Sequence, residues 1–438
     1  MKRLLLLVTV ALAGSFYSAR AQEAKFDEAG IIKKIEKLEA DTQNPKKSGK
    51  AATWIDLGKA YYDAATAAAT GLFRGLDEVA AKMLFPKPQE GTETVGNVEY
   101  VKWSYPYFDV YLKDGAVYFW TMKKQVVENA LDKAVKAYEK AYEIDNAAKV
   151  GEGLIQIANA YKQNADNFSG ARQFLPMADA FATAYAVEQH PAVNKFDTLA
   201  CYYAGYLYTL EKKFDLAEKF LKEAIDHGIY CIDEGSEGET YYYLFHSLYG
   251  QKKMDEAKQA LIDGITKFPK NSEILEAMIG FYNETKEDPK TIIPYIQKGI
   301  ENDPNNADLW SGLGSVYERL GDNQKATEAF TKAVSLVPDD FGANYNFGLM
   351  IARMADEKTT EFNNKEFASR EERDAALDEI VKVYAQAVGP LEKALAASPS
   401  DEATLQLLKN ICFRLRDTSP EMMEKYNKYN EMYKNLGE

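Results

Sequence analysis

Small residues and prolines recur along this chain with a period of about 34 residues, and apolar residues fill the positions between them. Three glycines follow one another at equal intervals: Gly280, Gly314 and Gly348. Three prolines follow at nearly the same interval: Pro269, Pro304 and Pro338. A proline ends a helix because it lacks an N–H and clashes with the preceding turn. The pattern therefore predicts a series of helical hairpins, each closed by a proline or a polar turn.

The clearest copy of the unit runs from Ala307 to Pro338. Its marker residues are Trp310, Leu313, Gly314, Tyr317, Ala326, Phe330, Ala333 and Pro338. This arrangement resembles the tetratricopeptide repeat, a helix–turn–helix unit of about 34 residues. The resemblance implies that the small residues let the two helices approach closely and that successive hairpins stack into a solenoid. It also implies that the chain holds partners and is not an enzyme.

We expect an all-α fold, a tetratricopeptide-like superhelix of about seven to eight hairpins, with a small antiparallel β insertion in the first repeat. The first repeat begins with Trp54, Leu57, Gly58 and Tyr61, but its second helix matches only at Ala134, Tyr138 and Ala141. The expected parts are a signal peptide at 1–21, a capping helix at 22–50, a first repeat at 51–145 split by an insertion at 71–125, a central array at 146–340, a repeat at 341–400 with a helical insertion at 355–382, and a capping hairpin at 401–438.

The insertion at 71–125 differs from the rest because its runs are short and rich in β-branched and aromatic residues. The predicted strands are Thr92–Val95, Val98–Trp103, Tyr107–Leu112 and Ala116–Trp120. Gly96-Asn97 and Asp114-Gly115 separate two of the pairs, and both dipeptides favour tight hairpin turns. The pattern predicts an antiparallel meander. The other insertion, 355–382, is charged and free of proline, which predicts a lengthened helical hairpin that turns at Asn363-Asn364.

The first residues have the composition of a secretory signal. Lys2 and Arg3 precede the apolar run Leu4–Gly14, and Ala19-Arg20-Ala21 is a small-x-small cleavage site. No cysteine follows that could carry a lipid anchor, and nothing later in the chain is long and apolar enough to span a membrane. We expect a periplasmic or secreted protein, with association with the envelope as an open alternative. A product that starts at Gln22 is similar to exported proteins of Bacteroidetes.

The charge of the chain excludes some classes of partner. The formal net charge is −14, and removal of the three basic residues of the signal would leave about −17. Such acidity argues against nucleic acids and anionic membrane surfaces, which require patches of Lys and Arg. Export would permit a disulfide between Cys201 and Cys231, while the alternative is three buried thiols that include Cys412.

Residues that could carry catalysis or bind a cofactor are sparse. The three histidines, at 190, 227 and 246, form no metal pair at helical spacing, and the chain lacks CxxC, HExxH and phosphate-loop motifs. Acidic pairs such as Asp339-Asp340 fit solvated turns between helices. We therefore expect no catalytic, cofactor-binding or metal-binding residues, and a non-enzyme.

The resemblance also implies a binding surface, because the first helix of each tetratricopeptide repeat lines a concave groove. The residues at groove-type positions are Tyr202, Tyr206, Tyr242, His246, Tyr249, Phe281 and Tyr345. Tyrosine suits a binding face since it offers a broad apolar ring and a hydroxyl. The alternative is that these rings pack between repeats. Because Lys, Asn and Arg are scarce here, a clamp for a C-terminal carboxylate is disfavoured. The favoured partner is a protein or peptide, of unknown identity, that presents apolar side chains or a helix.

Two other functions compete with a protein scaffold. Starch-binding outer-membrane proteins of Bacteroidetes also contain such repeats and stack sugars on aromatic rings. Trp103 and Trp120 in the β insertion keep a glycan-binding function open. An enzyme sheltered by the insertion is the third possibility.

Overall fold

The computed structural model describes residues 26–145, 149–233, 235–269, 271–285 and 288–435. The chain divides into two compact units. The N-terminal unit comprises Met1–Ile232 and His246–Lys253, and the C-terminal unit comprises Asp233–Phe245 and Met254–Glu438. The predicted signal peptide, residues 1–21, lies outside the described residues. No helix within the described ranges is long and apolar enough to cross a membrane.

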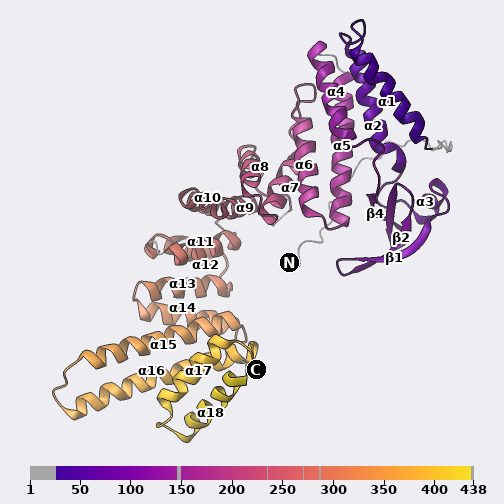
Figure 1. The fold of residues 1–438 in the computed structure, drawn as a ribbon. Helices are drawn as coiled ribbons and strands as arrows, with labels where there is room; N and C mark the ends of the chain where they lie inside the picture. The colour runs from indigo at the N-terminus through magenta and orange to yellow at the C-terminus, as the bar shows by residue number, and fades with distance from the viewer. Residues whose placement is uncertain (1–25, 146–148, 234, 270, 286–287, 436–438) are drawn as a thin grey trace. The chain divides into compact units, whose positions relative to one another are not determined.

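The N-terminal unit is built from helices that pack in pairs (Figure 1). Its helices are α1 (Glu28–Gln43), α2 (Ala51–Thr66), α3 (Glu78–Leu84), α4 (Ala130–Ile144), α5 (Lys149–Gly170), α6 (Phe174–Glu188), α7 (Thr198–Leu210) and α8 (Phe214–Asp226), with a 3₁₀ turn at Ala67–Ala69. The pairs are α2 with α4, α5 with α6, and α7 with α8, and α1 packs on α2. The first pair therefore forms although the β insertion separates its two helices in the sequence.

Glycines set the close approach of the helices in these pairs. A Cβ added to Gly58 of α2 would lie 2.8 Å from the ring of Tyr138 on α4. A Cβ added to Gly205 of α7 would lie 2.8 Å from the side chain of Leu221 on α8. Each partner side chain thus occupies the space that a larger residue would need. This contact is the physical reason for the small residue that the repeat pattern places on the first helix.

The insertion forms the predicted antiparallel meander. Its strands are β1 (Gln89–Val95), β2 (Val98–Ser104), β3 (Phe108–Lys113) and β4 (Ala116–Met122), in the order β1-β2-β3-β4. Both predicted turn dipeptides connect strands. The backbone φ is +64° at Gly96, +54° at Asp114 and +77° at Gly115, a region that glycine and aspartate tolerate in hairpin turns. Strand β1 begins earlier and β4 ends later than the pattern predicts.

Each face of the sheet is covered by a different part of the N-terminal unit. One face packs against residues 68–85, which include α3. On the other face, α5 approaches so closely that a Cβ added to Gly170 would lie 2.6 Å from Phe119. The side chain of Asn167 accepts a hydrogen bond from the backbone N–H of Trp120 at 3.1 Å. The outer edge of β4 is paired as well, since Val117 exchanges backbone hydrogen bonds with Gly75 and Leu76.

The C-terminal unit contains helices only, within the part of it that the structure describes. They are α10 (Met254–Lys267), α11 (Ser272–Thr285), α12 (Ile293–Asn302), α13 (Ala307–Arg319), α14 (Asn323–Leu336), α15 (Phe341–Asn364), α16 (Arg370–Ala397), α17 (Glu402–Leu415) and α18 (Pro420–Asn435), with a 3₁₀ turn at Pro289–Thr291. Helix α9 (Glu239–Gly250) is divided, because its residues up to Phe245 belong to the C-terminal unit and those from His246 to the N-terminal unit.

The three evenly spaced glycines of this unit do not have the same environment. A Cβ on Gly314 would lie 2.8 Å from Phe330, and one on Gly348 would lie 2.5 Å from Leu391. At Gly280, by contrast, an added Cβ would meet no described atom within 4 Å. Gly280 therefore has the same spacing as the other two glycines, but no described part of a partner helix packs closely against it. In that hairpin the close approach is made from the second helix, where a Cβ on Gly299 would lie 2.5 Å from Leu275.

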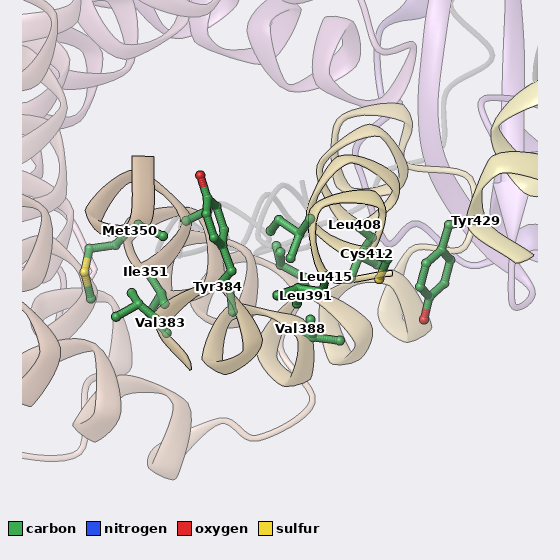
Figure 2. Packing of buried hydrophobic residues seen from close by; sticks show 14 of the residues in the cluster. Met350, Ile351, Val383, Tyr384, Val388, Leu391, Leu408, Cys412, Leu415 and Tyr429 are labelled. Atoms are coloured by element: carbon green, nitrogen blue, oxygen red, sulfur yellow. The ribbon is translucent and has the colours of Figure 1, made fainter. Parts of the chain in front are cut away.

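The last four helices share one hydrophobic core (Figure 2). Residues 355–382 lengthen both α15 and α16, which pack side by side along the hairpin (Figure 1). Figure 2 shows Met350 and Ile351 of α15, Val388 and Leu391 of α16, and Leu408 and Cys412 of α17 in this core. Tyr429 closes the core from α18, and its hydroxyl donates a hydrogen bond to Glu392 of α16.

Candidate partner-binding surface

Helix α7 carries the first two candidate groove residues, one turn apart. The helix begins after Asp197, whose side chain caps it by accepting a hydrogen bond from the N–H of Ala200 at 2.9 Å. The rings of Tyr202 and Tyr206 are nearly parallel, with centroids 6.3 Å apart and planes inclined by 10°. Tyr202 is buried, whereas Tyr206 is half-buried. Of this pair, Tyr206 offers its ring to solvent.

Two more candidates, His246 and Tyr249, lie in the part of α9 that belongs to the N-terminal unit, and both are half-buried. Hydrogen bonds attach this part of α9 to the preceding hairpin. The hydroxyls of Thr209 on α7 and Ser247 are 2.9 Å apart and buried. The Gln251 amide donates to the carbonyl oxygen of Phe214 at 3.2 Å. Burial lowers the pKa of His246 below its usual 6.5 and so favours the neutral form of its ring.

The remaining candidates, Tyr242, Phe281 and Tyr345, lie in the C-terminal unit. Phe281 is buried and meets Phe245 edge-to-face, with ring centroids 6.1 Å apart. Tyr242 and Tyr345 are half-buried. The Tyr345 ring stacks on Phe341 at a centroid distance of 5.6 Å.

Tyr242 lies in acidic surroundings. Burial raises its pKa, and the nearby carboxylates of Glu273 and Glu276 raise it further. Burial also raises the pKa of Glu276, with additional contributions from Asp308 and Glu273. A partner that contacts Tyr242 would therefore meet both an aromatic ring and negative potential.

The seven candidates thus fall into two groups. Tyr202 and Phe281 are buried, so in this conformation they pack the helices. The other five combine a packed part of the ring with an exposed part. Helical spacing could place all seven residues on first helices. It could not tell the buried residues from the half-buried ones, because the burial of each side chain depends on the neighbouring hairpin.

The two tryptophans that kept a glycan-binding function open are core residues. Trp103 is 1% exposed and Trp120 is 6% exposed. Both belong to the hydrophobic cluster between the sheet and residues 68–85. Neither ring can stack on a sugar in this conformation. Alternation along β2 does not mark this burial, because Tyr100 and Trp103 lie on opposite faces of the sheet and both are buried.

The cysteines and two of the histidines serve packing. Cys201 and Cys412 are buried free thiols, so Cys201 and Cys231 are not bridged, and Cys231 is half-buried. The Cys201 thiol lies 3.4 Å from the carbonyl oxygen of Phe220, and burial raises the pKa of this thiol to about 12. The rings of His190 and Tyr142 meet at 4.8 Å. His227 stacks on a phenylalanine ring at 3.8 Å.

A buried ionic network, which the sequence pattern did not indicate, links α5, α6 and the start of α7. Glu188 is almost fully buried, and the ammonium groups of Lys162 and Lys195 each lie 2.8 Å from its carboxylate. Asp197 meets the same two lysines at 3.0 and 3.2 Å. Although burial opposes it, the hydrogen bond from the N–H of Ala200 and the nearby lysines lower the pKa of Asp197. The network fixes the connection between two hairpins.

Comparisons with solved structures return other repeat proteins. The chain is similar to YrrB, described as a tetratricopeptide repeat protein with an unusual peptide-binding site, at 19% identity over 48% of this chain and 96% of that one, with a TM-score of 0.33. It is also similar to the C-terminal part of a repeat-containing protein from Cytophaga hutchinsonii, at 14% identity over 64% and 95% of the two chains, with a TM-score of 0.43. A repeat protein from Bacteroides fragilis matches at 15% identity over 58% and 97%, with a TM-score of 0.29.

A comparison with curated proteins gives no match. The family model of the tetratricopeptide repeat matches residues 118–348, which is more than half of the chain. This range begins in β4 and ends in the first turns of α15. The chain belongs to the tetratricopeptide repeat family.

Proposed function

We propose that this chain is a non-enzymatic scaffold of the cell envelope that holds a protein or peptide partner on the faces of its first helices. Proteins of this family generally act as scaffolds for protein interaction. The observation that carries the proposal is the recurrence of half-buried aromatic residues at groove-type positions. Tyr206 and Tyr249 provide them in the N-terminal unit, and Tyr242 and Tyr345 in the C-terminal unit.

The chemistry of these positions defines the kind of partner. A half-buried tyrosine has a ring already held by its neighbours, so little side-chain entropy is lost when a partner covers it. Aromatic anchors of this kind dominate the energy of many interfaces. Around Tyr242, the carboxylates of Glu273 and Glu276 favour a partner that carries basic groups beside its apolar ones. The partner is an apolar segment or helix with some positive charge.

The proposed location rests on the start of the sequence. The apolar run Leu4–Gly14 and the site at Ala19-Arg20-Ala21 support export with cleavage after Ala21, as in exported proteins of Bacteroidetes. Mass spectrometry of the native protein tests this directly. The expected first residue is Gln22, and detection of Met1 on a cytoplasmic product would refute export.

A site-specific photo-crosslinker tests the binding surface itself. A photoreactive phenylalanine derivative at Tyr206 or at Tyr249, both in the N-terminal unit, should crosslink one and the same partner in cells. The same group at Lys332, an exposed position on the second helix α14, serves as the control. Crosslinking from Lys332 alone, or different products from every position, would contradict the proposed surface.

Substitution separates binding from packing. We expect Tyr206→Ala and Tyr242→Ala to weaken binding of the crosslinked partner by about 2 kcal/mol each, because aromatic anchors cost this much when they are truncated. Melting curves of the same variants provide the control. Normal binding together with a large drop in melting temperature would mean that these rings serve packing alone.

A further inference from the structure

Strand β1 forms an outer edge of the meander that pairs with β2 alone among the described parts of the chain. The strand order β1-β2-β3-β4 leaves two outer edges. The edge of β4 is paired with Gly75 and Leu76. On β1, by contrast, no backbone hydrogen bond to an element other than β2 occurs within the described ranges. Most of its side chains are exposed. We call the outer side of this strand the β1 edge.

The phase of the ladder determines which backbone groups point outward from β1. Opposite residues in an antiparallel pair alternate between hydrogen-bonded and non-hydrogen-bonded positions. The two-residue turn Gly96-Asn97 closes on Val95 and Val98, which makes these two a hydrogen-bonded pair. The N–H of Tyr105, just after β2, donates to the carbonyl oxygen of Phe108 at 2.9 Å, so even-numbered residues of β2 face β1. Both observations leave the same residues of β1 with N–H and C=O groups directed away from the sheet: Glu90, Thr92 and Thr94.

Strand β1 lacks two features that commonly protect an edge strand, a proline and a β-bulge. Its sequence contains no proline, and its register with β2 is continuous over all seven residues. The irregularity in the sheet lies between Tyr111 and Leu112, where β3 pairs with β4. A regular edge strand with free backbone groups is a template for the addition of another strand.

The charges on β1 are compensated by neighbouring lysines. Lys82 lies 2.7 Å from the carboxylate of Glu90, and Lys102 lies 2.6 Å from that of Glu93. Residues 71–125 contain seven Lys or Arg and seven Asp or Glu, so their net charge is zero, while the chain carries −14. Two copies of so acidic a chain repel each other over most of their surface. The insertion is therefore a part of the chain at which two copies can meet without a local excess of like charge.

Antiparallel pairing of β1 with β1 of a second copy has one symmetric register that uses the whole strand. It places Thr92 opposite Thr92 of the second copy, Glu90 opposite Thr94, and Gly91 opposite Glu93. No carboxylate then faces another carboxylate, a pairing that would be destabilising. Moving the two-fold axis by one residue, to Glu93, would set the two Glu93 side chains opposite each other. In the full-length register the outward residues form about six backbone hydrogen bonds between the copies.

We propose that the β1 edge pairs antiparallel with the β1 edge of a second copy of this chain, so that two four-stranded meanders form one continuous sheet about a two-fold axis. Main-chain hydrogen bonds supply the affinity, and the self-complementary side chains set the register. This contact is separate from the partner-binding surface, since none of the groove candidates belongs to the insertion. The dimer therefore presents two copies of that surface.

Sedimentation equilibrium of the full chain without the predicted signal, from about 1 to 300 µM, tests the proposal, because an interface of this size is weak. We expect the wild type to dimerise reversibly in this range. Thr92→Lys sets two ammonium groups opposite each other and should raise the dimer Kd at least about tenfold. Val101→Lys is the matched control. Val101 is 46% exposed and lies opposite Thr92 on β2, so the same charge is added one strand further from the edge. This variant should change the Kd by less than about threefold.

Cysteine crosslinking tests the register. In a Cys231→Ser background, Thr92→Cys should form a disulfide between copies on oxidation, because directly opposed Cα atoms lie about 5.5 Å apart. Thr94→Cys alone should not crosslink, since Thr94 faces Glu90 of the second copy. The double variant Thr94→Cys with Glu90→Cys should crosslink again. Equal melting temperatures of all variants show that the edge and not the fold was altered.

Three results would overturn the proposal. The first is a wild type that stays monomeric up to about 300 µM. The second is an equal weakening of the dimer by Thr92→Lys and Val101→Lys. The third is crosslinking of Thr94→Cys as efficient as that of Thr92→Cys. A monomeric wild type whose Thr92→Cys variant forms a disulfide with another protein in cells would assign the β1 edge to that protein instead.

Discussion

The carboxylate of Asp166 should destabilise the folded chain at neutral pH, and its removal should stabilise the protein. Asp166 lies on α5, next to Asn167, which binds the backbone of β4. Burial raises the pKa of Asp166 from 3.8 to about 6, although the charge of Arg74 opposes the shift. No hydrogen bond or ion pair to the Asp166 side chain occurs within the described part of the chain. The charged form is therefore poorly compensated where α5 packs on the sheet.

The pKa shift sets the size and the sign of the effect. In the unfolded chain Asp166 should titrate near its ordinary value of 3.8, so the folded state binds the extra proton between pH 3.8 and about 6. Stability therefore falls as the pH rises through this interval. A shift of about two units corresponds to roughly 3 kcal/mol above pH 7. Allowing for water that reaches a partly exposed carboxylate, we expect about 1–3 kcal/mol.

Denaturation of Asp166→Asn at two pH values measures this contribution. At pH 8 the variant should be more stable than the wild type by about 1–3 kcal/mol, and at pH 4 the difference should largely vanish. Asp378→Asn, an exposed position on α16, is the matched control and should change little at either pH. Equal gains at pH 4 and pH 8, or a loss of stability at pH 8, would refute the argument.

Three further substitutions test the packing. Gly314→Leu should destabilise the protein by roughly 1–3 kcal/mol in urea denaturation, because Phe330 fills the space that the new side chain needs. Gly280→Leu should destabilise it less, and equal effects would contradict the difference between the two glycines. Glu188→Gln should cost about 1–3 kcal/mol because the two lysines lose a buried charged acceptor while Asp197 still pairs with both. An unchanged unfolding midpoint would show that Glu188 contributes nothing to the network. Asn167→Ala should lower the free energy of unfolding by about 1 kcal/mol and speed up hydrogen exchange at the backbone N–H of Trp120, because this N–H loses its acceptor. Unaltered exchange would show that this hydrogen bond does not protect the N–H of Trp120.

Local chemistry explains which parts of the fold the sequence could predict. Gly96-Asn97 and Asp114-Gly115 determine their own turns, because few residues tolerate a positive φ, and the meander follows from them. Gly314 and Phe330 belong to one hairpin, so their contact can be predicted from the sequence of a single repeat. Gly280 has the same spacing, yet an added Cβ there would meet no described atom within 4 Å.

The exposure of the candidate residues could not be predicted from the sequence, because exposure is a property of the assembled chain. Tyr202 and Tyr206 are equivalent in helical spacing, yet only Tyr206 keeps part of its ring in solvent. In the sequence alone, Trp103 and Trp120 could serve as stacking surfaces for sugars. In the structure, both are buried in the hydrophobic cluster between the sheet and residues 68–85. The raised pKa of Asp166 arises from burial near Arg74, a residue that lies far earlier in the sequence.

The insertion in the first hairpin has a consequence for the order of folding. Helices α13 and α14 are joined by residues 320–322 alone, whereas residues 67–129 separate α2 from α4. Closing the longer connection costs about 2–3 kcal/mol more in chain entropy if the intervening segment is unstructured. Contacts distant in sequence also form slowly. The α13–α14 hairpin can therefore form early by itself. Helix α2 packs on α4 only after the meander has folded and brought the two ends of the long connection together.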